Sequence, residues 1–165
     1  MSIKTVFYSF HYKRDVYRVQ MVRNINAIQG DPILGAQEWE TVRNQSQPAI
    51  VRWIDSQMSH KRAVVVLIGQ ETASRDWVKY EIKKAWDMNK PMVGVYIHGL
   101  ASLPIGSTDS KGADPFLKVP GVGNVPTFDP TKFDWLGRID SKATYANLSQ
   151  NLEYYVSQAR RRVER

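Results

Sequence analysis

The segment AVVVLIGQETASRDWVKYEIKKAW, residues 63–86, determines the fold class. It begins with an uninterrupted run of apolar side chains that ends at Gly69, which is typical of a strand buried on both faces. The remainder carries apolar residues at helical spacing, and Ser74 is the expected cap at which the helix starts. A buried strand followed by an amphipathic helix predicts one βα unit of a parallel sheet.

The same alternation continues on both sides of this segment. The expected elements are a strand at 5–10, a helix at 15–29, a weakly signalled short strand within PILGAQEW at 32–39, a helix at 47–59 and a strand at 92–98. Ser46 is the expected cap of the helix at 47–59, and Pro48 lies near its first turn. Strands alternating with helices predict an α/β fold, with a parallel sheet that helices cover on both faces.

The C-terminal third lacks this regularity at first. Residues 99–135 are dense in Gly, Pro, Ser and Asp and predict a long loop, a kind of segment that is usually functional or mobile. A helix is then expected at about 143–164, with an apolar stripe of Leu148, Leu152, Tyr155, Val156, Ala159 and Val163. The arginines at 160–162 should favour its C-terminus. A length of 165 residues suits one domain over 1–165.

Composition excludes several classes of function. The chain has no cysteine, which rules out thiol nucleophiles, thiolate zinc sites and disulfides. A net charge of +7 suits an anionic partner, but the basic residues are scattered, so solvated helix faces are expected and nucleic-acid binding ranks last. The first apolar stretch is too short and broken for a signal peptide or a membrane span. We therefore expect a cytoplasmic protein without membrane contact.

Glu81 occupies an unusual position on the predicted helix. At about 100° per residue, the buried face consists of Val78, Ile82, Ala85 and Trp86, and the outward face of Tyr80, Lys83, Lys84 and Asp87. Glu81 falls between the two faces, on the same shoulder as Trp77. Its carboxylate is expected at the rim of the core, near the carboxyl edge of the sheet, where open parallel sheets bind ligands. The alternative is an ordinary surface ion pair with Lys84.

Ser74, Trp77, Glu81 and Ile82 form the pattern S-x-x-W-x-x-x-E-I after a Val-rich strand, and this pattern resembles the signature of TIR domains. Further matching stretches are VFYSFHYKRD (6–15), Trp39 with Glu40, VVVLIGQETASRDWVKYEI (64–82), VGVYIHG (93–99) and SKGADPF (110–116). Together they resemble the TIR-like ThsB family of the Thoeris antiphage system. The chain departs from the family at Val78, where Cys is frequent, and at Asp114, where Asn is frequent.

The resemblance implies a flavodoxin-like fold and an enzyme that consumes NAD at the glutamate matched by Glu81. Such an enzyme, an NAD nucleosidase and cyclase, releases nicotinamide and cyclises the remainder to a cyclic ADP-ribose isomer. This second messenger activates a partner NADase effector. NAD is then a substrate, and no cofactor or metal is implied. TIR sites are commonly completed by a neighbouring protomer, which implies a possible homo-oligomer on activation.

Three candidate substrate-binding residues close the first strand. Ser9, Phe10 and His11 should lie at the carboxyl edge of the sheet, where they suit hydrogen bonding and stacking against a nucleotide. Core packing is the alternative for Phe10, since aromatic side chains usually bury area. A surface-loop histidine is the alternative for His11, whose charge would change only near neutral pH.

Three further candidates lie elsewhere in the chain. Trp39 could shape the pocket, with a buried core position as the alternative, and Trp77 is expected to support Glu81 from one helical turn away. Asp114 lies in the long loop, which could close over the substrate and exclude water. A surface Ω-loop is the alternative for that segment.

The chemistry assigned to Glu81 follows from the bond that is broken. Loss of nicotinamide gives the ribose oxocarbenium character, and a carboxylate near the sugar stabilises that charge. The chain contains no G-x-G-x-x-G or Walker A motif, and His11, His60 and His98 lack zinc-site spacing. The competing hypothesis is a non-enzymatic TIR interaction or assembly module.

Overall fold

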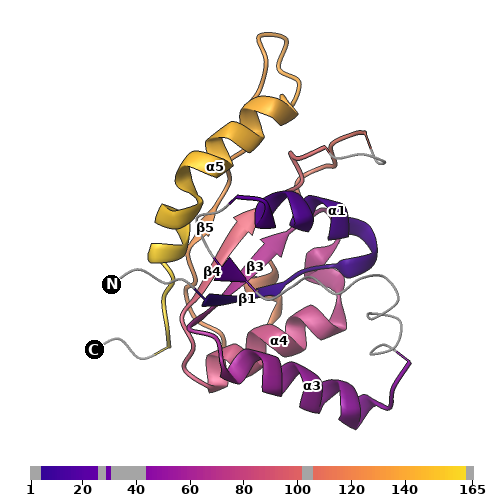
Figure 1. The fold of residues 1–165 in the computed structure, drawn as a ribbon, viewed down its shortest axis with the longest axis vertical. Helices are drawn as coiled ribbons and strands as arrows, with labels where there is room; N and C mark the ends of the chain where they lie inside the picture. Colours follow the sequence, from indigo (N-terminus) through magenta and orange to yellow (C-terminus); the bar gives the residue numbers. More distant parts are fainter. Residues whose placement is uncertain (1–4, 26–28, 31–43, 102–105, 163–165) are drawn as a thin grey trace.

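A five-stranded, all-parallel sheet forms the middle of the molecule (Figure 1). The computed structural model describes residues 5–25, 29–30, 44–101 and 106–162. The strand order is β2-β1-β3-β4-β5, which is the flavodoxin-like order of doubly wound sheets. The α/β, flavodoxin-like fold expected from the sequence is therefore confirmed.

The strands are β1 (Thr5–Ser9), β2 (Gln29–Gly30), β3 (Ala63–Ile68), β4 (Met92–Tyr96) and β5 (Thr127–Phe128). The helices are α1 (Tyr12–Arg23), α3 (Gln47–Ser59), α4 (Asp76–Asp87) and α5 (Ser141–Ser157), with two short 3-10 helices, η1 (Thr72–Ser74) and η2 (Pro115–Lys118). In a flavodoxin-like order the chain reverses its winding direction between β1 and β3. The carboxyl ends of these two strands therefore flank the edge where ligands are expected.

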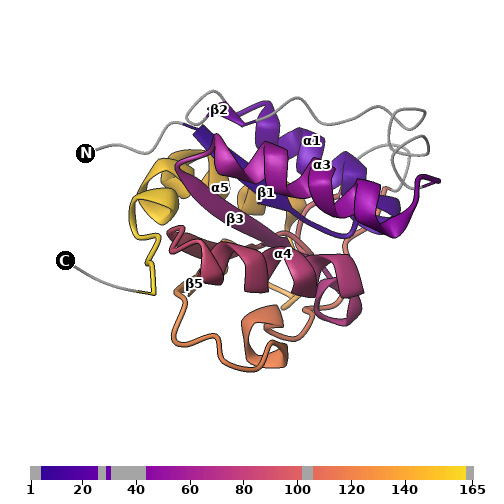
Figure 2. The same cartoon turned by 90° about the horizontal axis from the view of Figure 1, so that it is seen from below.

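The side chains of β3 alternate between two hydrophobic cores, one on each face of the sheet. Ala63, Val65 and Leu67 pack into the core that α1 and α5 cover. Their neighbours along β3 pack into the core that α3 and α4 cover, as the view from below in Figure 2 illustrates. Because both faces are covered, every residue of β3 must be apolar, which explains the unbroken run in the sequence.

The helix α3 begins where the sequence indicates, whereas α4 does not. Ser46 caps α3, and its hydroxyl accepts a hydrogen bond from the backbone N–H of Ala49. Ser74 was expected to cap α4, but that expectation is wrong: Ser74 ends η1 and donates its hydroxyl to the carbonyl oxygen of Glu71. The helix α4 therefore starts at Asp76, and its cap position, Arg75, supplies no side-chain hydrogen bond.

Several boundaries in the rest of the chain differ from the expected ones. The segment 99–135 is not a continuous loop, because it contains η2 and β5. The last helix ends at Ser157 rather than near residue 164, since the chain then turns so that Arg160 forms an antiparallel bridge with Met92. The short strand expected within 32–39 lies outside the described residues.

The helix α1 starts three residues earlier than expected and ends at Arg23. Its start is fixed by His11, whose ring nitrogen Nδ1 accepts a hydrogen bond from the backbone N–H of Arg14. Across the described ranges, no helix combines the length and the apolar character needed to cross a bilayer.

Candidate active site

Ser9 and Glu81 meet at the carboxyl edge of the sheet. Ser9 is the last residue of β1, and Glu81 lies in the second turn of α4. The Ser9 hydroxyl donates a hydrogen bond to Glu81 Oε1 over 2.7 Å. The two residues are 72 positions apart in the chain, so the contact depends on the packing of α4 beside β1. Both had been singled out from the sequence, and the fold brings them together.

Glu81 is a buried carboxyl group. Only 9 % of the residue is exposed, although it lies on a helix that is otherwise amphipathic. Burial raises the pKa of Glu81 to about 8, while the hydrogen bond from Ser9 acts in the opposite direction. The alternative of a surface pair with Lys84 is not what the structure shows, because Lys84 pairs with Asp55 instead, at 3.5 Å.

The two residues after Ser9, Phe10 and His11, have different surroundings and therefore different roles. Phe10 is half-buried and packs against the core under α1 and α5, which favours the packing interpretation. His11 is buried, so the surface-loop alternative is wrong; its ring is enclosed because it caps α1. Burial, followed by the positive charge of Arg75, lowers the pKa of His11. These effects favour the neutral form of His11, and Arg75 at the start of α4 is close enough to act on it.

Among the described residues, neither Trp77 nor Asp114 makes a direct polar contact with Glu81. Trp77 is half-buried against the core under α3 and α4, and its ring meets that of Tyr80 edge-on at 5.7 Å. Tyr80 does not point outward as expected, since its hydroxyl donates to Asp55 at 2.9 Å. Asp114 caps η2 by accepting from the backbone N–H of Phe116 at 2.9 Å. Trp39 lies outside the described residues.

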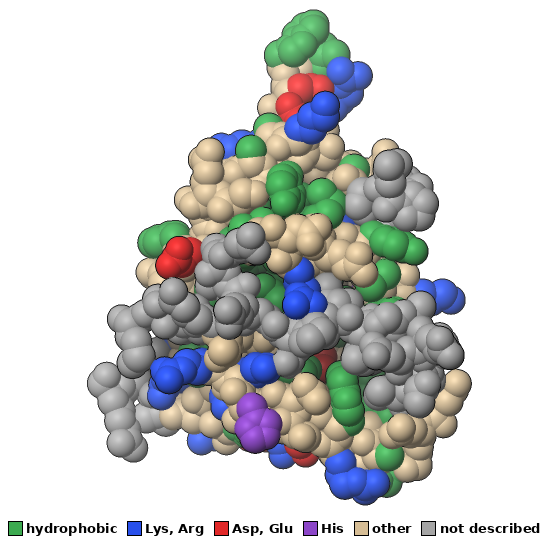
Figure 3. Space-filling view, in the orientation of Figure 1, with side chains coloured by type: hydrophobic (Ala, Val, Ile, Leu, Met, Phe, Trp, Pro, Cys, Tyr) green, Lys and Arg blue, Asp and Glu red, His purple; other side chains and the backbone are tan. Residues whose placement is uncertain are grey.

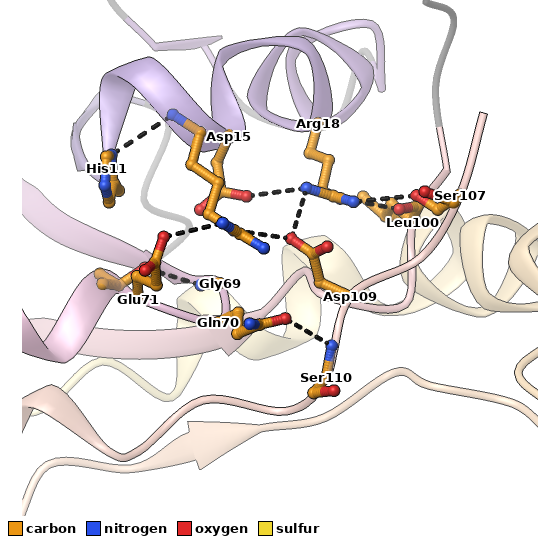
Figure 4. A network of polar contacts seen from close by, with 12 residues as sticks. His11, Asp15, Arg18, Gly69, Gln70, Glu71, Leu100, Ser107, Asp109 and Ser110 are labelled. Atoms are coloured by element: carbon orange, nitrogen blue, oxygen red, sulfur yellow. Dashed lines mark hydrogen bonds and ion pairs between the residues drawn. The ribbon is translucent and has the colours of Figure 1, made fainter. Parts of the chain in front are cut away.

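A buried arginine in α1 organises the surroundings of this edge (Figure 4). Arg18 is 1 % exposed, and it donates to the side chains of Asp15 and Asp109, both at 3.0 Å. It also donates to the carbonyl oxygens of Leu100 and Ser107, at 2.8 and 2.9 Å. One guanidinium group thereby holds α1 and the segment after β4 together.

Further contacts hold that segment above the end of β3. Arg14 donates to Asp109 and Glu71, and Gln70 Oε1 accepts from the backbone N–H of Ser110 (Figure 4). Gly112 lies so close to the carbonyl oxygen of Gly69 that a Cβ atom would overlap with it. The stretch 106–114 is therefore fixed against the turn between β3 and α4. The helix α4 carries Glu81.

The sequence analysis missed the arginine network. A signal for it exists, because Asp15 and Arg18 are charged residues within a helix whose buried residues also include Val19 and Val22. Charges among buried positions predict an internal ion pair. Their third member, Asp109, could not be found in this way, because it lies 91 positions from Arg18 in a segment without periodicity.

A second polar cluster lies at the end of β4. His98 is 3 % exposed, and its Nε2 lies 3.3 Å from the hydroxyl of Thr131, while its Nδ1 has no partner in the described structure. Lys111 pairs with Asp129 at 3.2 Å and lies 4.5 Å above the ring of Tyr96. These contacts connect the segment before η2 to the stretch after β5.

The arrangement can hold one carboxylate in a poorly hydrated position with a hydroxyl group beside it. Such a carboxylate interacts strongly with a positive charge, since little water screens it. Within the described ranges, no group of three or more His, Asp or Glu side chains could hold a metal ion. The chemistry that these residues support is the binding of a cation or the stabilisation of a cationic transition state.

Comparison with known proteins is consistent with this chemistry. The family described as Thoeris protein ThsB, TIR-like domain, matches residues 7–102. The chain is also similar to a curated protein of Bacillus cereus (strain MSX-D12) named "Putative cyclic ADP-D-ribose synthase ThsB1", with 34 % identity over 119 residues. The matched region covers 68 % of this chain and 61 % of that protein. The family match includes the last three residues of β1 and all of β3, α4 and β4, and with them Ser9 and Glu81. The chain therefore belongs to the TIR-like family of the Thoeris protein ThsB.

Proposed function

We propose that the protein cleaves the nicotinamide ribosyl bond of NAD and cyclises the product to a cyclic ADP-ribose isomer in antiphage defence. The observation that carries the proposal is the buried carboxylate of Glu81, held by Ser9 at the carboxyl edge of a flavodoxin-like sheet. Family membership and the name of the Bacillus cereus relative support the same activity.

The proposed reaction is a heterolytic cleavage. The electron pair of the bond between ribose and nicotinamide leaves with nicotinamide, which becomes neutral, and the sugar acquires oxocarbenium character. A hydroxyl group or an adenine nitrogen of the same molecule then attacks the sugar and completes the ring, and a proton is released where the attacker is a hydroxyl. Glu81 is the proposed catalytic residue in this scheme, because its buried carboxylate at the carboxyl edge of the sheet would stabilise the cationic sugar.

The ionisation of Glu81 is coupled to substrate binding. Without substrate, the raised pKa keeps much of the carboxyl group protonated at neutral pH. The pyridinium ring of NAD carries a positive charge, and a positive charge nearby favours the ionised form. We propose that substrate binding lowers the pKa of Glu81, so that the carboxylate forms in the complex. Ser9 is a positioning residue, which fixes Oε1 and favours the ionised state.

The remaining candidates have supporting roles in the proposal. The segment 106–114, which includes Asp114, borders the edge and would exclude water, so that cyclisation competes with hydrolysis. His11, Phe10, Trp39 and Trp77 are proposed to contact the nucleotide or to shape its site. The cyclic product would activate an effector NADase, and a second copy of the chain could complete the site on activation. NAD acts as substrate, without a cofactor.

The direct test is incubation of the purified protein with NAD, followed by chromatography of nicotinamide and of the remaining nucleotide. We expect equal amounts of nicotinamide and of a cyclic product with the mass of ADP-ribose less one water. We propose that infection activates the enzyme, and the assay should therefore also use lysate from phage-infected cells that express the protein.

The matched variant is Glu81→Gln, which keeps the size and the hydrogen bond to Ser9 but cannot ionise. Loss of turnover with an unchanged circular dichroism spectrum supports the proposal. Full turnover in this variant contradicts it, and the interaction-module hypothesis would then be favoured.

A further inference from the structure

Three exposed apolar side chains of the described structure lie together on a hairpin between β5 and α5. We call residues 131–140 the finger. It closes through an antiparallel bridge between Phe133 and Ile139 and protrudes beyond the start of α5, as the orange loop at the top of Figure 1. Its tip exposes Trp135 by 90 %, Phe133 by 62 % and Leu136 by 53 %. No described part of the chain covers these side chains.

The finger is a formed structure and not a loose loop. Asp134 Oδ1 accepts hydrogen bonds from the backbone N–H groups of Leu136 and Arg138, both at 2.9 Å, and its Oδ2 accepts from the Arg138 guanidinium at 3.0 Å. Gly137 turns the chain at a φ of +80°, which favours glycine. The backbone that carries the aromatic side chains is thus held in one conformation, which reduces the entropic cost of binding.

The charges around the tip are complementary to an anionic surface. Lys132, Arg138 and Lys142 are exposed, and basic side chains lie together with an acidic one beneath the apolar tip in Figure 3. Asp134 pairs with Arg138 at 3.0 Å, and Asp140 caps α5. Three basic and two acidic residues over 131–142 leave an excess of one positive charge, which Lys132 and Lys142 present. The whole chain has a net charge of +7, which opposes the approach of a second copy.

The area of the tip also limits what it can bind. If each of the three large side chains presents roughly 150–250 Å² when fully exposed, their exposed parts amount to about 300–500 Å². A standard protein interface takes about 800 Å² from each partner. The tip is too small for such an interface alone, whereas insertion into a lipid interface requires no further surface.

We propose that the finger is a docking site for an anionic lipid bilayer. Trp135, Phe133 and Leu136 would enter the interfacial layer, which Trp side chains favour, and the basic residues below would lie against the phosphate headgroups. This inference departs from the sequence-based expectation of no membrane contact, which rested on the lack of a membrane span and of a signal peptide. It does not depend on the proposed enzymatic activity.

The test is flotation of the full chain with vesicles of phosphatidylcholine alone, or with about one third phosphatidylglycerol, in low-salt buffer. We expect at least a fivefold enrichment on the anionic vesicles. Trp135→Ala should reduce that enrichment at least fivefold, and the double change Lys132→Gln with Lys142→Gln at least threefold. The matched control is Leu117→Ala, since Leu117 is 82 % exposed but lies on η2, away from the finger. All these sites are on the surface, so folding should be unaffected.

Three results would overturn the proposal. The first is the absence of wild-type binding to anionic vesicles, and the second is an equal loss in Leu117→Ala and Trp135→Ala. The third is binding that Trp135→Ala leaves intact but that disappears with added salt, which indicates plain electrostatic adsorption. Self-association that Trp135→Ala abolishes, without vesicle binding, would assign the finger to a second copy of the chain.

Discussion

The hydroxyl of Ser9, at the end of β1, donates to the buried carboxyl group of Glu81 on α4 over 2.7 Å. Within the described residues, this contact is the one side-chain hydrogen bond that the Glu81 carboxyl group makes, and it joins the end of β1 to α4 at the expected ligand edge. The ionisation of Glu81 is therefore sensitive to Ser9, to pH and to any bound cation, and each of these dependences can be measured.

Stability should fall as the pH rises, because of Glu81. Its pKa is raised from 4.5 to about 8, so between these values the folded chain binds more protons than the unfolded chain. The free energy of unfolding then decreases with pH across this window, by a few kcal/mol in total. Glu81→Gln should remove this term and stabilise the protein at pH 8.5, but not at pH 4. Urea unfolding at both pH values measures the difference, and a variant less stable at pH 8.5 would contradict it.

The rate of NAD turnover should depend on pH with the opposite sign. The proposed reaction needs ionised Glu81, so kcat/KM should rise about tenfold per pH unit below a value near 8 and level off above it. Because bound NAD carries a positive charge, it should lower the pKa of Glu81 in the complex, and kcat should rise at a lower pH than kcat/KM does. Stopped assays between pH 5.5 and 9.5 provide both profiles. A kcat/KM that decreases with pH across this range would exclude a carboxylate mechanism.

Ser9→Ala should impair catalysis without unfolding the protein. The hydrogen bond from Ser9 lowers the pKa of Glu81. Without it, the pH at which kcat/KM levels off should be higher. We expect a reduction in kcat of roughly 10- to 100-fold, which is the usual cost of a lost interaction with a catalytic group. Ser9→Thr keeps the hydroxyl group and should restore most of the rate. A rate lost equally in both variants, with no shift in the profile, would assign Ser9 to packing alone.

Arg18 should be essential for folding. Arg18→Met removes four hydrogen-bonding interactions and leaves the carboxyl group of Asp15 buried without a charge partner. Breaking a buried pair in this way costs about 3–5 kcal/mol. Lys13→Met, at an exposed site on the same helix, is the control and should change the stability by less than about 0.5 kcal/mol. Equal melting temperatures for the two variants would show that the network adds little.

Gly112 should not tolerate a side chain. In Gly112→Ala the new Cβ would overlap with the carbonyl oxygen of Gly69, which is backbone and cannot rotate away. We expect a loss of roughly 1–3 kcal/mol from the forced shift. The adjacent Ala113→Ser, at an exposed site, serves as control. Protease cleavage within 106–114 should be faster in Gly112→Ala than in the control if the close contact holds this segment.

The central part of the fold could be predicted because its sequence signals are local. The strand β3 is buried on both faces, and this explains its uninterrupted apolar run. The helices α3 and α4 are each buried on one face, and this explains the helical spacing of their apolar residues. β5 could not be predicted, because it has only the two residues Thr127 and Phe128, which are too few to show a periodicity. Its pairing with β4 depends on the tertiary structure. Ser74 misled the expectation because a cap residue was available two positions before the helix.

The candidate site, too, could be predicted only in part from the sequence. Ser9 and Glu81 were found from their places at a strand end and on a helix shoulder, because the parallel topology implies a shared edge. The burial of Glu81 was only partly foreseen, since the helix pattern placed it at the rim of the core. The contacts of Arg18 and the exposure of Trp135 depend on how distant segments pack, and no spacing in the sequence encodes them.

The outermost strands of the sheet have a consequence for how the protein behaves at high concentration. β2 and β5 contain two residues each, whereas the six-residue strand β3 lies at the centre. Short edges offer few unpaired backbone groups to another sheet, a feature by which natural proteins avoid aggregation through strand pairing. Within the described residues, the edges of this sheet therefore disfavour strand pairing between copies of the chain.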